Sequence, residues 1–230
     1  GLTAAEAAQF GNRDIGADLE VVPLTDWDPN SFWYELNRPY VLTSPNLPTP
    51  EPVYIYPGTV IFEGTNLSEG RGTALPFHFL GAPYIPSPEK FVARVTELMK
   101  PYCPVDRAGV FLRPCQFQPT YQKWSDQACN GLQIHVLEPK RVPSFALALA
   151  VLRAAYELSD GKFEFTPPPY EYNHEVTPIK LILGRLDVID HLTGPQFDLN
   201  APYWADGCSE YGEQVGRNLL YPRQLTVLNP

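Results

Sequence analysis

The sequence GLQIHVLEPKRVPSFALALAVLRAAYEL, residues 131–158, contains the two kinds of periodicity that decide the fold class. Apolar side chains occupy alternate positions of residues 132–137, from Leu132 to Val136, which is typical of a strand with one buried face. Residues 143–158 carry their apolar side chains at helical spacing instead. We therefore expect a strand and a long helix at this point of the chain.

The flanking sequence contains further helix and strand signals. Thr3 and Glu6 match a capping box that opens a helix over residues 3–10, and Ser87 followed by Pro88 is typical of the start of a helix that runs to residue 100. Further strands are predicted at residues 18–24, 59–62 and 109–112, and further helices at residues 178–192 and 209–220. The predicted fold class is α+β (mixed α/β), with short strands and several helices joined by long Pro-rich loops.

Proline is over-represented, with 26 residues in a chain of 230. Residues 44–58 hold five prolines, which predict an extended, stiff segment. A linker and a polyproline ligand are two interpretations of this segment. A packed loop that lines a surface is favoured, because aromatic and apolar residues follow at once.

The charge balance and the hydrophobic content exclude two classes of partner. Lys and Arg total 17 against 26 Asp and Glu, which gives a formal net charge of −9. Such a surface repels a phosphate backbone, so we expect no nucleic acid partner. The longest apolar run, residues 145–152, is too short to cross a bilayer, so we expect no membrane span.

Neither the cysteines nor the histidines have the spacing of metal ligands, so we expect no metal and no cofactor. The four cysteines form no C-x-x-C pair. Two interpretations of them remain open. Cys115 and Cys129 could form a disulfide across a hairpin, or all four cysteines could be free thiols. Among the scattered histidines only His78 lies near a polar motif.

That motif is EGTNLSEGRGT, residues 63–73, directly after the predicted strand at residues 59–62. It lacks the glycine pattern of a nucleophile elbow and the lysine of a P-loop. Its two carboxylates suit glycosidic bond cleavage, which needs a proton donor and commonly a second carboxylate. Arg71 could keep one carboxylate ionised or grip a substrate carboxylate. A surface turn in which Glu and Arg pair only with each other is the alternative.

A second candidate segment is Tyr170-Glu171-Tyr172, which three prolines introduce. Tyrosine rings stack on sugar faces and tyrosine hydroxyls bind sugar oxygens. The alternative is that these aromatic side chains pack in the core or at its rim.

At these residues the sequence closely resembles the NamZ family of bacterial exo-β-N-acetylmuramidases. The resemblance runs through most of the chain and is most specific in residues 63–73. It extends over residues 44–49, 56–58, 76–77, 81–83, 117–119, 129–131 and 168–172. It implies removal of a terminal N-acetylmuramic acid from the non-reducing end of peptidoglycan fragments. Members of the family pair an N-terminal Rossmann-like domain with a C-terminal domain, with the active cleft between them.

The resemblance also implies a domain organisation. Residues 1–28 are expected to be the tail end of the N-terminal Rossmann-like domain or a connection, and residues 29–230 the C-terminal domain of a two-domain protein. The chain starts at Gly1 and its one methionine is Met99, so we expect the natural start to be missing. The missing N-terminal domain of the same protein is then a partner, alongside peptidoglycan-derived sugars. An extracytoplasmic location, periplasmic or secreted, follows from the resemblance and the substrate.

The site residues follow from their places in the matching motifs. Glu69 is the expected catalytic acid or base, and Glu63 is its partner or its structural support. Arg71 is expected to anchor the lactyl carboxylate of N-acetylmuramic acid. The other expected substrate-binding residues are Asn66, Ser68, Tyr170, Glu171 and Tyr172. The alternative function is a non-catalytic peptidoglycan-binding or carbohydrate-binding module that supplies half of a cleft.

Overall fold

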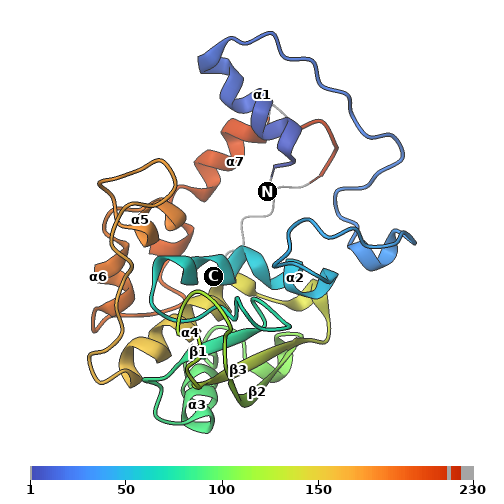
Figure 1. Ribbon diagram of the computed structural model, residues 1–230. Coiled ribbons are helices and arrows are strands. Elements are labelled where there is room, and N and C mark those ends of the chain that lie inside the picture. The colour runs from blue at the N-terminus through green and yellow to red at the C-terminus, as the bar shows by residue number, and fades with distance from the viewer. Residues whose placement is uncertain (1, 217–218, 224–230) are drawn as a thin grey trace. The chain divides into compact units, whose positions relative to one another are not determined.

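The computed structural model describes residues 2–216 and 219–223 (Figure 1). The chain divides into two compact units, one formed by residues 40–200 and the other by residues 1–39 together with residues 201–230. The expected boundary between residues 28 and 29 stays a prediction. The larger unit contains the motif at residues 63–73.

The centre of the larger unit is a small antiparallel sheet in the order β1-β3-β2 (Figure 1). Its strands are β1 (Phe79–Ala82), β2 (Val110–Phe117) and β3 (Cys129–Val136). The predicted strands at residues 109–112 and 132–137 are therefore confirmed, and β1 was not predicted. In β3, Leu132 and Ile134 are fully buried because the strand is central and has a neighbour on each edge.

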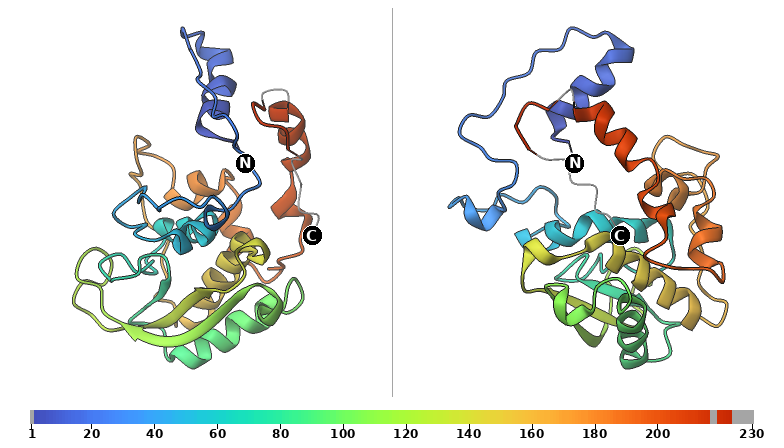
Figure 2. Two further views of the ribbon diagram at one scale, coloured as in Figure 1. Left: turned by 90° about the vertical axis from the view of Figure 1, so that its right-hand side faces the viewer. Right: turned by 180° about the vertical axis from the view of Figure 1, so that it is seen from behind.

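Helices pack around this sheet, and Figure 2 shows them from two further sides. Helix α3 (Pro88–Met99) contacts β2, β3 and α4 (Ser144–Leu158), and α4 also contacts α2 (Pro50–Thr59). The side chain of Ser87 caps α3 by accepting from the backbone N–H of Lys90, as the sequence predicts. The predicted helices at residues 87–100 and 143–158 are confirmed.

The smaller unit contains α1 (Ala4–Ile15) and α7 (Cys208–Gly216). The capping box of Thr3 and Glu6 forms as predicted, and α1 continues beyond residue 10. Both carboxylate oxygens of Glu6, a fully buried residue, accept hydrogen bonds from the guanidinium of Arg223, at 2.8 and 2.6 Å. This buried ion pair links the two ends of the chain within the unit.

Several sequence predictions are wrong. Residues 18–24 form no strand, because no segment of the described chain pairs with them, and Val22 is exposed. Residues 50–59 form helix α2 instead of an extended loop, since Pro50 and Pro52 lie in its first turn, where a helix needs no backbone N–H donors. Residues 59–62 enter a 3-10 helix, Val60–Gly64, and not a strand.

The C-terminal helices differ from their predicted extents. The single helix expected at residues 178–192 is two short helices, α5 (Pro178–Leu183) and α6 (Val188–Thr193), because Gly184 ends the first. The helix expected at residues 209–220 is confirmed only up to Gly216, where α7 ends. Residues 219 and 220 are not helical, and residues 217 and 218 lie outside the described chain.

All four cysteines are free thiols, so the disulfide interpretation is wrong. The alternative, four buried free thiols, is confirmed for Cys115 and Cys129, whereas Cys103 is partly exposed and Cys208 is exposed. The hairpin expected between Cys115 and Cys129 does form. Its register places Cys115 opposite Gly131 and Cys129 opposite Phe117, so the two cysteines are not paired across the strands. Burial raises the pKa of both thiols, and that of Cys129 to about 12.

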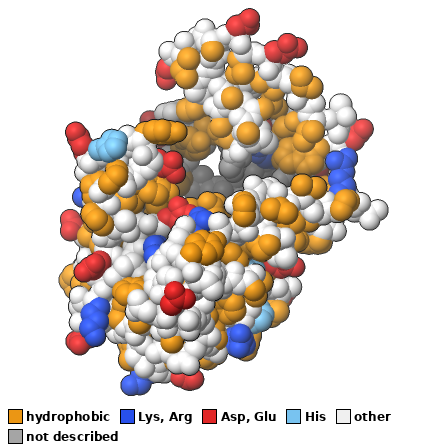
Figure 3. All heavy atoms as spheres, in the orientation of Figure 1, with side chains coloured by type: hydrophobic (Ala, Val, Ile, Leu, Met, Phe, Trp, Pro, Cys, Tyr) orange, Lys and Arg blue, Asp and Glu red, His pale blue; other side chains and the backbone are white. Residues whose placement is uncertain are grey.

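The described residues contain neither a membrane-spanning helix nor a cluster of metal-ligating side chains. No helix within them is long and apolar enough to cross a membrane. In the same part of the chain, no group of three or more His, Cys, Asp and Glu side chains could hold a metal ion. On the face drawn in Figure 3, acidic and basic side chains are interspersed.

Candidate active site

Residues 63–73 form a compact turn that begins in the 3-10 helix Val60–Gly64 and runs towards β1. Ser68 forms an isolated antiparallel bridge with Gly81 of β1. Gly70 has a φ of 76°, and a Cβ there would lie 2.7 Å from the carbonyl oxygen of the first residue of β1. This turn therefore requires glycine, and its attachment to the sheet fixes the direction of the neighbouring side chains.

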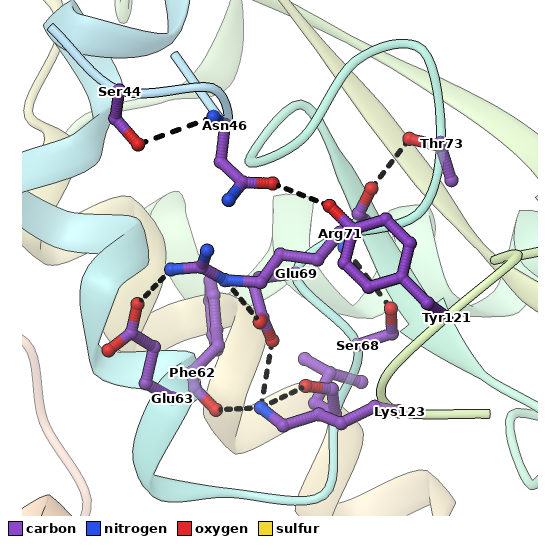
Figure 4. A network of polar contacts seen from close by, with 12 residues as sticks. Ser44, Asn46, Phe62, Glu63, Ser68, Glu69, Arg71, Thr73, Tyr121 and Lys123 are labelled. Atoms are coloured by element: carbon purple, nitrogen blue, oxygen red, sulfur yellow. Dashed lines mark hydrogen bonds and ion pairs between the residues drawn. The ribbon is translucent and has the colours of Figure 1, made fainter. Parts of the chain in front are cut away.

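The turn brings two carboxylates to one guanidinium. Nη2 of Arg71 lies 2.6 Å from Oε1 of Glu63, and Nε of Arg71 lies 3.1 Å from Oε1 of Glu69 (Figure 4). Burial alone would lower the pKa of Arg71, but the contact with Glu63 and the charge of Glu69 raise it overall. The three side chains that the sequence singled out as acid, partner and anchor thus form one ion-paired group.

Lys123 completes this group, and sequence reasoning missed it. Its Nζ lies 2.8 Å from Oε2 of Glu69, 2.7 Å from the carbonyl oxygen of Phe62 and 3.2 Å from that of Leu67 (Figure 4). We call Glu63, Glu69, Arg71 and Lys123 the ionic cluster. The two acids and two bases have a combined formal charge of zero.

Aromatic side chains contact two members of the ionic cluster, Glu63 and Arg71. The hydroxyl of Tyr170 donates to Oε2 of Glu63 at 2.9 Å, and Cζ of Arg71 lies 5.1 Å from the centroid of the Phe77 ring. Tyr56 packs edge-on against Phe77. Burial and the negative charge of Glu63 raise the pKa of both tyrosines, so both hydroxyls stay protonated donors near neutral pH.

Asn66 makes its polar contacts within the protein. Its Oδ1 accepts from the hydroxyl of Tyr84 at 2.9 Å and from the backbone N–H of Glu164 at 3.1 Å, and its Nδ2 donates to the carbonyl oxygen of Lys162 at 2.8 Å. These contacts tie the turn to residues 162–164. They favour a structural role, and contact of Asn66 with a substrate stays a prediction.

The other expected substrate-binding residues differ in their surroundings. Ser68 is buried, and its Oγ accepts from the backbone N–H of Gly70 at 3.1 Å. Tyr170 lies at the ionic cluster, whereas Tyr172 is 97% exposed. Glu171 is exposed and has a φ of 50°. Of the Tyr170-Glu171-Tyr172 segment, only Tyr170 is brought to the carboxylates by a hydrogen bond that we observe, and the sugar platform stays a prediction.

The two carboxylates have different chemical access. The side chain of Glu69 is 3% exposed, and each of its oxygens contacts a cation. The buried side chain of Glu69 therefore offers almost no accessible surface to a substrate. The side chain of Glu63 is 19% exposed and receives one bond from a cation and one from a neutral hydroxyl. Glu63 is therefore the carboxylate of the cluster that a substrate can reach.

Comparison with known proteins gives matches along nearly the whole chain. A sequence model described as exo-β-N-acetylmuramidase NamZ, C-terminal, matches residues 54–221, and its N-terminal counterpart matches residues 1–51. The peptidoglycan β-N-acetylmuramidase NamZ of Bacillus subtilis (strain 168) is 36% identical over 167 residues. These residues are 72% of this chain and 38% of that protein, so the chain spans less than half of its relative.

Two solved structures of DUF1343 family proteins from Bacteroides fragilis NCTC 9343 share the fold. One superposes with a TM-score of 0.74 at 17% identity, covering 96% of this chain and 56% of the other. The second has a TM-score of 0.53 at 21% identity, covering 79% and 44%. The α+β class expected from the sequence is confirmed.

Proposed function

Because the chain belongs to the NamZ family of exo-β-N-acetylmuramidases, as its motifs predicted, we propose that it forms the C-terminal part of a glycoside hydrolase. The substrate is a peptidoglycan fragment, from whose non-reducing end the enzyme removes N-acetylmuramic acid during recycling of the cell wall. The N-terminal domain of the same protein completes the site. The protein works outside the cytoplasm, in the periplasm or as a secreted enzyme.

The observation that carries this proposal is the ionic cluster within the family motif. Cleavage of a glycosidic bond needs a carboxyl group beside the scissile oxygen or the anomeric carbon. Glu63 offers a reachable carboxylate whose two oxygens are oriented by Arg71 and Tyr170. We therefore assign the substrate-facing role in this chain to Glu63.

Glu69 has a different role in this proposal from the one expected from the sequence. Both of its oxygens are ion-paired and its side chain is buried, so a substrate cannot reach it. It holds Arg71 in place through the 3.1 Å contact with Nε. Its action as acid or base stays a prediction, and the same experiment tests both assignments.

Arg71 has charge partners but retains an exposed part. Its side chain is 20% exposed, and Nη2 and Nε are the atoms that contact the carboxylates. An arginine that stacks on a phenylalanine ring and keeps one nitrogen for a ligand suits the lactyl carboxylate of N-acetylmuramic acid. We propose this contact as the anchor of the substrate.

The test is release of 4-nitrophenol from 4-nitrophenyl β-N-acetylmuramide by this chain alone and by the full-length protein. We expect turnover in the full-length protein and a loss of about 10²–10⁴-fold in kcat for Glu63→Gln, the range of acid–base assistance. Glu69→Gln should lower kcat and also lower the thermal stability, because it breaks two buried ion pairs. Binding of N-acetylmuramic acid without any turnover by the full-length protein would instead support the binding-module alternative.

A further inference from the structure

The ammonium group of Lys123 uses all three of its N–H donors in contacts with the family motif and the residue before it. A lysine ammonium has three N–H donors, and three acceptors lie within 3.2 Å of this Nζ, on Phe62, Leu67 and Glu69. Two of the acceptors are backbone carbonyl oxygens: that of Phe62 just before residues 63–66, and that of Leu67 just after them. Lys123 therefore clamps the backbone of the motif and the buried carboxylate with one group (Figure 4).

The contacts continue from Lys123 to the substrate-facing group as a chain of alternating charges. Lys123 contacts Glu69, Glu69 contacts Arg71, and Arg71 contacts Glu63. Removing Lys123 would leave one oxygen of the buried Glu69 without its cation. Because a buried carboxylate that loses one of its cations is costly, Glu69 would then move, and Arg71 would lose its second support.

The loop that carries Lys123 is held in an unfavourable backbone conformation. It joins β2 to β3, and Gln122, Trp124 and Asp126 have φ values of 64°, 60° and 59°. Non-glycine residues in this region cost free energy and persist where surrounding contacts impose them. Two of these three residues, Gln122 and Trp124, are the immediate neighbours of Lys123, so the unfavourable backbone conformation lies on both sides of this lysine.

Two attachments to the motif impose this conformation. Nε1 of Trp124 donates to the carbonyl oxygen of Asn66 at 2.6 Å, and the backbone N–H of Thr120 donates to the carbonyl oxygen of Gly72 at 2.9 Å. A Cβ at Gly72 would lie 2.7 Å from the backbone nitrogen of Tyr121, so the loop approaches the motif too closely for a side chain. The loop is thus fixed to both ends of the segment that contains Glu69 and Arg71.

We propose that Lys123 is a positioning residue for the glycosidase reaction: it fixes the Glu69 carboxylate through Oε2, and through Glu69 it holds Arg71 and Glu63 in their working geometry. Lys123 contacts no substrate in this role. The inference rests on the proposed function, because it needs a reaction to which Glu63 contributes. It adds a residue from a separate segment of the chain to the site.

The experiment compares Lys123→Met with the wild type in the full-length protein, using the chromogenic β-N-acetylmuramide. Methionine keeps most of the length of the side chain and removes the charge and the donors. We expect kcat to fall about 100-fold, with KM changed less than about threefold, since a misplaced catalytic group costs about this much. Lys90→Met, at an exposed position of α3, is the matched control and should keep the wild-type kcat.

A double variant separates positioning through Glu69 from a purely structural role. If Lys123 acts through Glu69, Lys123→Met should cost little further kcat in a protein that already carries Glu69→Gln, because residues of one contact network are not additive. A wild-type kcat/KM in Lys123→Met overturns the proposal. Losses that simply multiply in the double variant Lys123→Met/Glu69→Gln overturn it too.

A readout without turnover distinguishes this proposal from the proposed function. The side-chain N–H signals of Arg71 can be followed by NMR in arginine-labelled protein, with Arg71→Lys assigning them. We expect the Nε–H signal of Arg71 to shift in Lys123→Met, because Glu69 loses its second cation; an unchanged signal overturns the positioning role. If the wild-type protein releases no 4-nitrophenol, the proposed function has failed, whereas the NMR signal still decides whether Lys123 holds Arg71 in place.

Discussion

Nη2 of Arg71 lies 2.6 Å from Oε1 of Glu63, and the two side chains are 20% and 19% exposed. Arg71 also contacts a second carboxylate, because Nε of the same guanidinium lies 3.1 Å from Oε1 of Glu69. One planar cation therefore sets the spacing of two carboxylates. The geometry makes the shape of Arg71 as important as its charge, and the first prediction follows from this.

Arg71→Lys should inactivate the enzyme although it keeps the positive charge. A lysine ammonium is a point charge on a flexible stem and cannot hold two carboxylates in the plane of a guanidinium. We expect kcat/KM to fall about 100-fold, the effect of a small misplacement of a reacting group. Steady-state kinetics with the chromogenic substrate measure this, and Arg107→Lys, on the 3-10 helix Val105–Arg107, serves as a control. Retention of more than half of the wild-type kcat/KM would contradict the bridging role.

Tyr170→Phe should weaken catalysis without changing the fold. The variant removes the hydroxyl that donates to Glu63 at 2.9 Å and leaves the ring. A hydrogen bond to a charged group contributes about 1.5–3 kcal/mol, so we expect kcat to fall about 10–100-fold. The circular dichroism spectrum should stay that of the wild type, because the ring and its packing remain. Tyr102→Phe, after the end of α3, is the matched control, and equal activities of the two variants would remove Tyr170 from the site.

Gly72→Ala should displace the loop that carries Lys123. Gly72 has a φ of 83°, and the added Cβ would lie 2.7 Å from the backbone of Tyr121. Strain and overlap together should cost about 1–3 kcal/mol of unfolding free energy and lower kcat. Gly161→Ala separates the two effects, since Gly161 has a φ of 75° with open space around it. Urea unfolding should show destabilisation in both variants, but only Gly72→Ala should lose activity; full activity in that variant would exclude the close approach.

The Glu6–Arg223 ion pair should make stability dependent on acid pH. The hydrogen bonds from Arg223 hold the pKa of Glu6 far below its ordinary value of 4.5, although burial acts in the opposite direction. The folded pKa is lowered, so the contribution is present above pH 4.5 and is lost as the pH falls below this value. Glu6→Gln should therefore be less stable than the wild type by about 1–3 kcal/mol near neutral pH, and the difference should shrink in acid.

Urea unfolding at about pH 7 and about pH 3 measures this dependence. Glu20→Gln, at an exposed position of the same unit, is the control and should match the wild type at both values. A difference between Glu6→Gln and the wild type that is the same at both pH values would show that the carboxylate charge is not what stabilises this unit.

Local signals in the sequence predicted the elements that depend on local contacts. Ser87 caps α3 and Thr3 caps α1 because a cap acts within one turn of helix. The strand expected at residues 18–24 failed for the opposite reason, since a strand needs a partner that its own residues do not specify. The four-residue strand β1 was missed because it is too short to show an alternating pattern.

The site was predictable to the same extent. Glu63, Glu69 and Arg71 lie within nine residues, so one motif indicated all three. Lys123 and Glu69 are 54 residues apart, and no sequence pattern around this single lysine predicts their contact. Family resemblance indicated where the proposed site lies, and only the three-dimensional contacts separate the more exposed carboxylate from the buried one.

The unequal sequence separations of these contacts imply an order of assembly. Glu63 and Arg71 are eight residues apart, and a loop this short closes early. The contact from Lys123 to Glu69 spans 54 residues and that from Tyr170 to Glu63 spans 107. Two distant segments must therefore pack against the motif before the cluster is complete. Recovery of catalysis during refolding should therefore lag behind recovery of the helical signal. Hydrolysis of the chromogenic substrate then reports when the last tertiary contacts of the cluster form.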